Sequence, residues 1–157
     1  MAKAYYDRGI VKKVLGRYEE AIVDYNEAIR LKPDDAEAYY NRGIVKYALG
    51  KSEEAIVDFN EAIRLKPDLA EAYYNRGFVE DKLGRYEEAI VDFNEAIRLK
   101  PDDAKAYILR GAAKRKLGNH EEAKRDFLFA LKLAEQQGND NLKTITEKMI
   151  QELKDKE

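Results

Sequence analysis

A period of 34 residues constrains the fold of this chain more than any other feature of its sequence. Units 36–69 and 70–103 differ at only seven positions, unit 2–35 is nearly as similar, and unit 104–137 is a more divergent fourth copy. The same spacing separates Pro33, Pro67 and Pro101, the glycines at 9, 43, 77 and 111, and those at 16, 50, 84 and 118. Self-similarity at a fixed period of this length indicates an array of one structural unit.

Each unit has the pattern of two helices, here named helix A and helix B. In unit 36–69, aspartates precede the segment AEAYYNRGIVKYA as N-cap candidates, and Gly50 follows it, where a left-handed residue would end the helix. The segment EEAIVDFNEAIRL opens with two glutamates, which favour a helix N-terminus, and stops before Pro67. Ala55, Phe59 and Ala62 recur at helical spacing, so helix B has one apolar face.

The pattern of small and aromatic residues is specific. Unit 70–103 carries Tyr73, Gly77, Tyr86, Ala89, Phe93, Ala96 and Pro101. This series resembles the tetratricopeptide repeat (TPR) family, and residues 2–137 follow it in four units. The departures are Ser52 and His120 at the aromatic position near the turn, and Glu135 in place of the last proline. The resemblance implies an all-α fold, a right-handed α-solenoid (superhelix) of antiparallel helix pairs.

The resemblance also implies a domain plan. We expect a single TPR domain over 1–157, with repeats 2–35, 36–69, 70–103 and 104–137 and a capping helix at about 139–155. Asn139 or Asp140 could cap this last helix, whose apolar residues are Leu142, Ile145, Met149, Ile150 and Leu153. Its polar outer face would cover the apolar surface of the last repeat.

An arginine recurs in the apolar stripe of every helix A, where the common TPR pattern has leucine. A buried guanidinium needs a partner, because leaving its charge unpaired would cost on the order of several kcal/mol. An aspartate follows each arginine by sixteen residues, on helix B. The sequence therefore predicts four structural ion pairs: Arg8 with Asp24, Arg42 with Asp58, Arg76 with Asp92, and Arg110 with Asp126. The alternative is that these arginines line a groove and bind acidic ligands.

A groove is the expected ligand site, because the resemblance implies that the A helices line a concave surface. The candidate peptide-binding residues are Tyr6, Tyr40, Asn41, Ile44, Tyr47, Tyr74, Asn75, Phe78, Ile108 and Arg115. Tyrosines offer rigid contact area and asparagines can donate to and accept from a peptide backbone. The competing interpretation is that the tyrosines pack against neighbouring A helices.

One ligand class is disfavoured. Chaperone-binding TPR domains hold a C-terminal carboxylate with lysines and asparagines, but Tyr40 and Ile44 stand where this clamp has its first lysine and asparagine. The last repeat is basic, because it contains Lys105, Arg115 and Lys116. An acidic segment of a ligand could bind there. The alternative is that these side chains only face solvent.

The residue inventory argues against catalysis. The chain has no cysteine, one histidine (His120) and one serine (Ser52), so it cannot assemble a nucleophile with its base or a nitrogen and sulfur metal site. It also lacks a phosphate-binding glycine motif. We expect no enzyme activity, no cofactor and no metal.

Charge and hydropathy limit the partners further. The 29 basic and 31 acidic side chains nearly balance, which predicts no strong attraction to nucleic acid or to a membrane. The opening MAKAYYDRG lacks the apolar core of a secretory signal, so a cytoplasmic location is expected. We expect a protein-interaction scaffold that binds a peptide or a partner helix. The alternatives are a self-assembling module, forming homo-oligomers through an uncapped first repeat, an engineered consensus-like module without a ligand, and an RNA-binding helical repeat.

Overall fold

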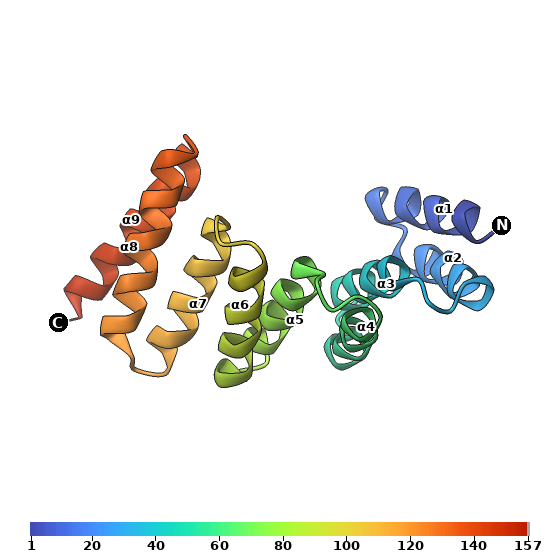
Figure 1. Cartoon of the computed structure of the whole chain (residues 1–157), viewed down its shortest axis with the longest axis horizontal. Helices are drawn as coiled ribbons and strands as arrows, with labels where there is room; N and C mark the ends of the chain where they lie inside the picture. The colour runs from blue at the N-terminus through green and yellow to red at the C-terminus, as the bar shows by residue number, and fades with distance from the viewer. Residues whose placement is uncertain (157) are drawn as a thin grey trace. The chain divides into compact units, whose positions relative to one another are not determined.

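The computed structural model describes residues 1–156, and within that range it contains nine α-helices and no β-strand (Figure 1). The all-α prediction is confirmed, and the helices pack against their neighbours in sequence as antiparallel pairs of the α-solenoid class. The helices are α1 (Ala2–Val14), α2 (Tyr18–Leu31), α3 (Ala36–Ala48), α4 (Ser52–Leu65), α5 (Ala70–Lys82), α6 (Tyr86–Leu99), α7 (Ala104–Lys116), α8 (His120–Gln136) and α9 (Asp140–Asp155).

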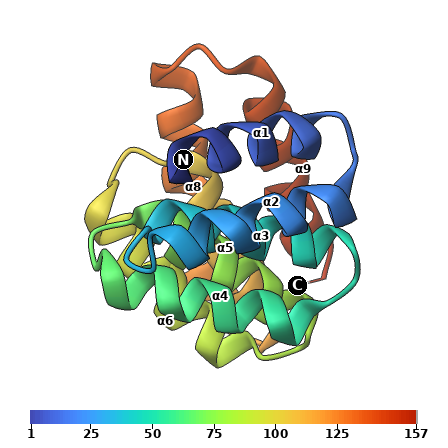
Figure 2. The same ribbon diagram turned by 90° about the vertical axis from the view of Figure 1, so that its right-hand side faces the viewer.

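The chain divides into two compact units. The first unit is Met1–Val79, and the second begins at Glu80, inside α5. In the first unit α1 packs on α2, α2 on α3 and α3 on α4. Figure 2 shows α1 and α2 side by side. In the second unit α6 packs on α7, α7 on α8 and α8 on α9.

The helix ends lie where the sequence signals place them. Gly50 has φ of 80° directly after α3 and its C-cap Leu49, and the equivalent glycines after α1, α5 and α7 have φ between 76° and 84°. Asp35 caps α3 by accepting a hydrogen bond from the backbone N–H of Ala38 at 3.2 Å. The last helix B, α8, runs on to Gln136, because Glu135 stands where the earlier repeats have proline.

The core of the first unit is built from one large aromatic residue per helix B. Tyr25 packs with Ala21 and Val45, and Phe59 packs with Ala55 and Val79. Gly43 on α3 makes this packing possible, since a Cβ there would lie 2.8 Å from Cε1 of Phe59. A side chain at position 43 would therefore require Phe59 or one of the two helices to shift.

The core of the second unit closes on the last helix. Phe127 and Ala123 of α8 pack with Ile150 and Leu153 of α9. The predicted apolar set of α9 is only partly buried, because Ile145 is 43% exposed. Thr146 is buried instead, and its hydroxyl donates to the carbonyl of Leu142 at 2.6 Å, which satisfies the polar group within the helix.

Candidate functional site

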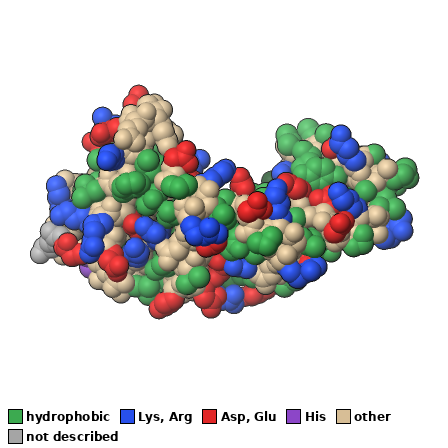
Figure 3. Space-filling view, in the orientation of Figure 1, with side chains coloured by type: hydrophobic (Ala, Val, Ile, Leu, Met, Phe, Trp, Pro, Cys, Tyr) green, Lys and Arg blue, Asp and Glu red, His purple; other side chains and the backbone are tan. Residues whose placement is uncertain are grey.

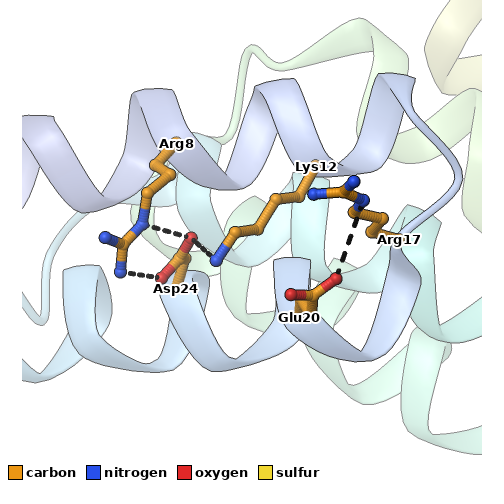
Figure 4. A network of polar contacts seen from close by, with 5 residues as sticks. All are labelled: Arg8, Lys12, Arg17, Glu20 and Asp24. Carbon is orange, nitrogen blue, oxygen red and sulfur yellow. Dashed lines mark hydrogen bonds and ion pairs between the residues drawn. The ribbon is translucent and has the colours of Figure 1, made fainter.

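Three of the four predicted ion pairs form as bidentate hydrogen bonds between an arginine of helix A and the aspartate sixteen residues later. Arg8 donates from Nε and Nη2 to the two carboxylate oxygens of Asp24 at 2.9 and 2.7 Å (Figure 4). The same geometry recurs at 2.9 and 2.8 Å between Arg42 and Asp58, and at 2.9 and 2.7 Å between Arg110 and Asp126. The pair Arg76 with Asp92 would join the two compact units and stays a prediction.

The aspartates of these pairs are the buried members. Asp24 and Asp58 are 1% and 2% exposed. The hydrogen bond from Arg8 holds the pKa of Asp24 below its usual value, Lys12 adds to this effect, and burial opposes it. The carboxylate is thus charged at neutral pH in a buried position, and it fixes helix A against helix B.

A lysine completes each of the three described clusters, and sequence reasoning missed it. Lys12 Nζ lies 2.9 Å from Asp24, Lys46 Nζ lies 3.0 Å from Asp58, and Lys114 Nζ lies 3.2 Å from Asp126. A signal was available, because each lysine follows its arginine by four residues and so lies on the same helix face.

The third guanidinium nitrogen, Nη1, donates to an asparagine of the preceding repeat. These asparagine contacts were not predicted from the sequence. Arg42 donates from Nη1 to Asn26 Oδ1 at 2.8 Å, and Arg76 donates to Asn60 at 2.9 Å. In the second unit Arg110 donates to Asn94 at 2.9 Å. Each asparagine precedes its arginine by sixteen residues, the spacing that also separates arginine from aspartate. Each of the three guanidinium nitrogens of Arg42 thus makes a hydrogen bond inside the protein, and the side chain is only 17% exposed, which disfavours the binding of an acidic ligand.

The predicted tyrosines and asparagines bind each other. Asn41 donates from Nδ2 to the hydroxyl of Tyr6 at 3.0 Å and to the carbonyl of Glu37 at 2.9 Å, and its Oδ1 accepts from Lys13 at 2.7 Å. Asn75 donates in the same way to the hydroxyl of Tyr40 at 2.9 Å and to the carbonyl of Glu71 at 2.8 Å. With Asn41 only 5% exposed, these contacts favour the interpretation that the tyrosines pack between neighbouring A helices.

Burial acts on the tyrosine hydroxyls as well. It raises the pKa of Tyr40 to about 12, and it also raises the pKa of Tyr6. The rings lie over the core aromatics, with centroids 6.1 Å apart for Tyr6 and Tyr25 and 6.0 Å apart for Tyr40 and Phe59. Both tyrosines are thus held at the ring and at the hydroxyl.

Three further predicted residues of the first unit lie together. Tyr47 and Phe78 make an edge-to-face contact with centroids 5.8 Å apart. Ile44 and Tyr47 pack against the cluster around Phe59. All three side chains are half-buried, so they present apolar area at the surface of α3 and α5.

An open pocket lies beside Tyr6. Its volume is about 300 Å³, and Tyr6, Lys3 and Asp7 of α1 line it together with Lys32 and with Glu37 of α3. The charged members that belong to the A helices, Lys3, Asp7 and Glu37, are exposed. Side chains of two A helices, α1 and α3, are thus jointly accessible in this pocket.

The predicted groove residues of the last repeats are less accessible to a ligand. Ile108 is 8% exposed, and Tyr74 is half-buried on α5. Arg115 lies 3.4 Å from Glu152 of α9, and Lys116 lies 3.0 Å from Asp81. Two of the three cations expected to make this end basic are therefore paired with carboxylates, while Lys105 is exposed.

Among residues 1–156 no group of three or more histidine, cysteine, aspartate or glutamate side chains is arranged to hold a metal ion. In the same range, no helix combines the length and the apolar character needed to cross a membrane.

The helix pairs, their 34-residue period and the close helix packing define a helical repeat protein. Models of the TPR repeat match residues 14–50 and 45–80, and models of the tetratricopeptide repeat match residues 70–103 and 104–137. The chain belongs to the tetratricopeptide repeat family.

Several solved structures are similar to this chain. A crystal structure of MamA is 29% identical with a TM-score of 0.85, covering 87% of this chain and 80% of that one. YrrB, described as a TPR protein with an unusual peptide-binding site, is 25% identical with a TM-score of 0.80, covering 94% of this chain and 75% of that one. The first TPR of Spaghetti (RPAP3), bound to the HSP90 peptide SRMEEVD, is 26% identical with a TM-score of 0.73, covering 74% and 93%. No curated protein gives a significant match.

Proposed function

We propose that this chain is a non-catalytic scaffold that binds an extended peptide or a partner helix along its A helices. The observation that carries the proposal is the open pocket of about 300 Å³ between α1 and α3, beside Tyr6. The likeness to TPR structures described with a bound peptide or a peptide-binding site supports it.

The residues divide into a frame and a contact surface. Tyr6, Tyr40, Asn41 and Asn75 form the frame, because their polar groups bind one another. The contact surface consists of the exposed charges Lys3, Asp7 and Glu37 and the half-buried apolar side chains Ile44, Tyr47 and Phe78. Because these four side chains are already held in place, little conformational entropy is lost when a peptide binds.

The pocket carries both signs of charge. A ligand that complements it places a basic side chain near Asp7 and Glu37 and an acidic one near Lys3. Arg115 of the last repeat is already paired with Glu152, so we expect this repeat to contribute less to peptide binding.

The test is a random-sequence peptide array probed with the labelled protein. The double variant Asp7→Lys and Glu37→Lys alters exposed side chains only, and it should change which sequences bind, favouring acidic peptides. The double variant Glu19→Lys and Glu87→Lys makes the same change of net charge at exposed positions of two B helices and should leave the selected sequences unchanged. Identical binding profiles for all three proteins would show that the pocket does not bind the peptide. Binding of single-stranded RNA that weakens steeply with salt would favour the nucleic-acid alternative instead.

Self-assembly is the second candidate, and one observation favours it. Val11, Val14 and Leu15 at the end of α1 are 56%, 77% and 61% exposed. Hydrophobic side chains gather over α1 at the upper right of Figure 3. Sedimentation at several protein concentrations tests for a dimer.

A further inference from the structure

The outer face of α8 differs from the outer faces of the other B helices at four positions of the repeat. In α6 these positions hold Val91, Asn94, Glu95 and Arg98, and in α8 they hold Arg125, Leu128, Phe129 and Lys132. Leu128 and Phe129 are 46% and 42% exposed. The last repeat therefore exposes two large apolar side chains where the other repeats carry an asparagine and a glutamate, and a cation lies on either side of them along the helix.

Neighbouring repeats do not cover this face. The other sides of α8 pack against α7 and α9. Val57 holds the position of Arg125 in unit 36–69, which has a unit before it and a unit after it in the sequence, and this valine is still 64% exposed. A further repeat at either end of the array would therefore leave the outer face of α8 open.

Lys132 on this face lacks the contact that its equivalents make. Arg98 of α6 pairs with Glu95, three residues earlier on the same helix. Phe129 stands in place of that glutamate on α8, and among residues 1–156 no hydrogen bond or ion pair engages Lys132. The Phe129 ring itself is held against Tyr107 of α7, with centroids 4.7 Å apart. The face thus combines an oriented aromatic ring with a cation that is available to a partner.

The same face is complementary to itself. A ridge along α8 is formed, at intervals of four, three and four residues, by Glu121, Arg125, Leu128 and Lys132. Glu121, like Lys132, makes no hydrogen bond or ion pair among the described residues. If two such ridges meet antiparallel about a two-fold axis, Glu121 lies opposite Lys132 at both ends. Leu128 then lies opposite the alkyl stem of Arg125, close to the axis, and Phe129 flanks the contact on each copy.

We propose that a second copy of this chain docks on this face, with the two α8 helices packed antiparallel about a two-fold axis. Glu121 of each copy pairs with Lys132 of the other, and Leu128 and Phe129 of both copies are buried in the centre. Such a contact uses the same patch twice and closes at a dimer. One helix per copy gives an interface below about 1,200 Å², so we expect the dimer to be weak. The face shares no residue with the proposed peptide pocket or with the apolar end of α1, so the proposal does not depend on either.

The outer face of α2 in a second copy matches α8 less well. Its central residues are Val23 and Asn26, and its Arg30 already pairs with Glu27. The contact would bury the exposed Leu128 of one copy only, and two different faces in contact do not close into a dimer. Association that continues beyond a dimer would identify this arrangement.

Sedimentation equilibrium tests whether the dimer forms and whether α8 forms it. Up to millimolar protein concentration we expect a monomer and a dimer and no larger species. Leu128→Asn gives α8 the residue that α6 carries at this position. It should raise the dissociation constant of the dimer at least roughly tenfold, because an amide replaces an apolar side chain of both copies at the centre. Val57→Asn is the matched control, because it makes the same kind of change at an exposed position of α4 and should leave the dimer unchanged.

Exchanging charges tests the antiparallel register. Lys132→Glu sets two glutamates against each other at both ends of the contact, so the dimer should dissociate. The double variant Glu121→Lys and Lys132→Glu exchanges the two charges and should restore the dimer, which a damaged fold could not do. Arg30→Glu is the control, since it makes the same change of charge at the equivalent position of α2 and should have no effect.

The proposal would be overturned by a monomer at every concentration, by association beyond a dimer, or by a double variant that stays monomeric. A dimer that Lys132→Glu leaves intact but Val14→Asp dissociates would also overturn it, and would assign self-assembly to the end of α1 instead.

Discussion

Asn75 of α5 donates a hydrogen bond to the hydroxyl of Tyr40 of α3 at 2.9 Å, and so links two successive A helices across one repeat. The residue is held in place by a second bond, from the same Nδ2 to the carbonyl of Glu71 at 2.8 Å. Tyr6 and Asn41 make the equivalent link one repeat earlier. These links run along the surface proposed to bind peptide, so they make that surface rigid before any ligand arrives.

Replacing Tyr40 with phenylalanine tests this link. Tyr40→Phe keeps the ring against Phe59 but removes the acceptor of Asn75, and we expect the free energy of unfolding to fall by about 1 kcal/mol. Urea unfolding followed by circular dichroism measures the change. The control is Tyr39→Phe, because the Tyr39 hydroxyl makes no hydrogen bond among the described residues; equal losses in the two variants would mean that the Asn75 contact contributes nothing.

The ion pair of Asp58 should contribute measurably to stability, because its cationic partners are largely buried. Asp58→Ala leaves Arg42 and Lys46, both largely buried, without their carboxylate, so we expect the free energy of unfolding to fall by roughly 3–5 kcal/mol. Adding Arg42→Leu to this variant should recover part of the loss, because an apolar residue needs no partner in that position. Thermal unfolding of the single and double variants tests both statements, and an unchanged melting temperature for Asp58→Ala would show that the pair adds no stability.

The lowered pKa of Asp24 predicts a loss of stability in acid. Its main cause is the hydrogen bond from Arg8, which the unfolded chain lacks. Below the unfolded pKa of about 3.9 the unfolded chain binds a proton that the folded state still excludes, so stability falls as pH decreases toward the folded pKa. Above that range the contribution is fully present.

Urea unfolding between about pH 6 and pH 2.5 measures this effect. The wild type should lose more stability over that range than Asp24→Asn, which has no carboxyl to protonate. Hydrogen bonds from arginines also lower the pKa values of Glu27, Glu61 and Glu95. These residues titrate in both proteins, so their contributions cancel when the two pH profiles are subtracted. Parallel pH profiles would show that Asp24 does not titrate differently in the folded and unfolded states.

The sequence predicts much of the fold because the period repeats every structural signal. Gly50 and Asp35 mark helix ends through local backbone chemistry, which needs no knowledge of the tertiary structure. The spacing of sixteen residues from Arg42 to Asp58 is long-range, yet it could be proposed because a buried arginine requires a partner and every repeat offers the same one. The arginine–aspartate spacing would be a weak signal in one repeat, but its recurrence in every repeat makes the pairing a specific prediction.

The candidate site was harder to predict, because it depends on how successive helices align. The residue type of Asn41 predicts ligand binding, but its amide donates to Tyr6, 35 residues away, and that contact follows only from the register of α1 against α3. The helical pattern places Ile108 on the groove, whereas in the structure this side chain is buried. A helical pattern identifies one apolar face, whereas an A helix in this array has neighbours on several sides.

Gly43 provides the last prediction, in which two effects of known sign compete. Replacing a helical glycine with alanine should add about 1 kcal/mol of stability through helix propensity. At Gly43 the new Cβ would lie 2.8 Å from Cε1 of Phe59 and 3.2 Å from the backbone carbonyl of Ala55, so the two helices would have to separate, at a cost of about 1–3 kcal/mol. We expect the steric cost to win, and Gly43→Ala to lower the urea midpoint. Gly50→Asn is the comparison, because asparagine tolerates the left-handed conformation and nothing lies within 4 Å of the added Cβ. A higher midpoint for Gly43→Ala would show that Phe59 moves aside freely, and the close approach of α3 to α4 would then be a consequence of the glycine rather than a requirement of the packing.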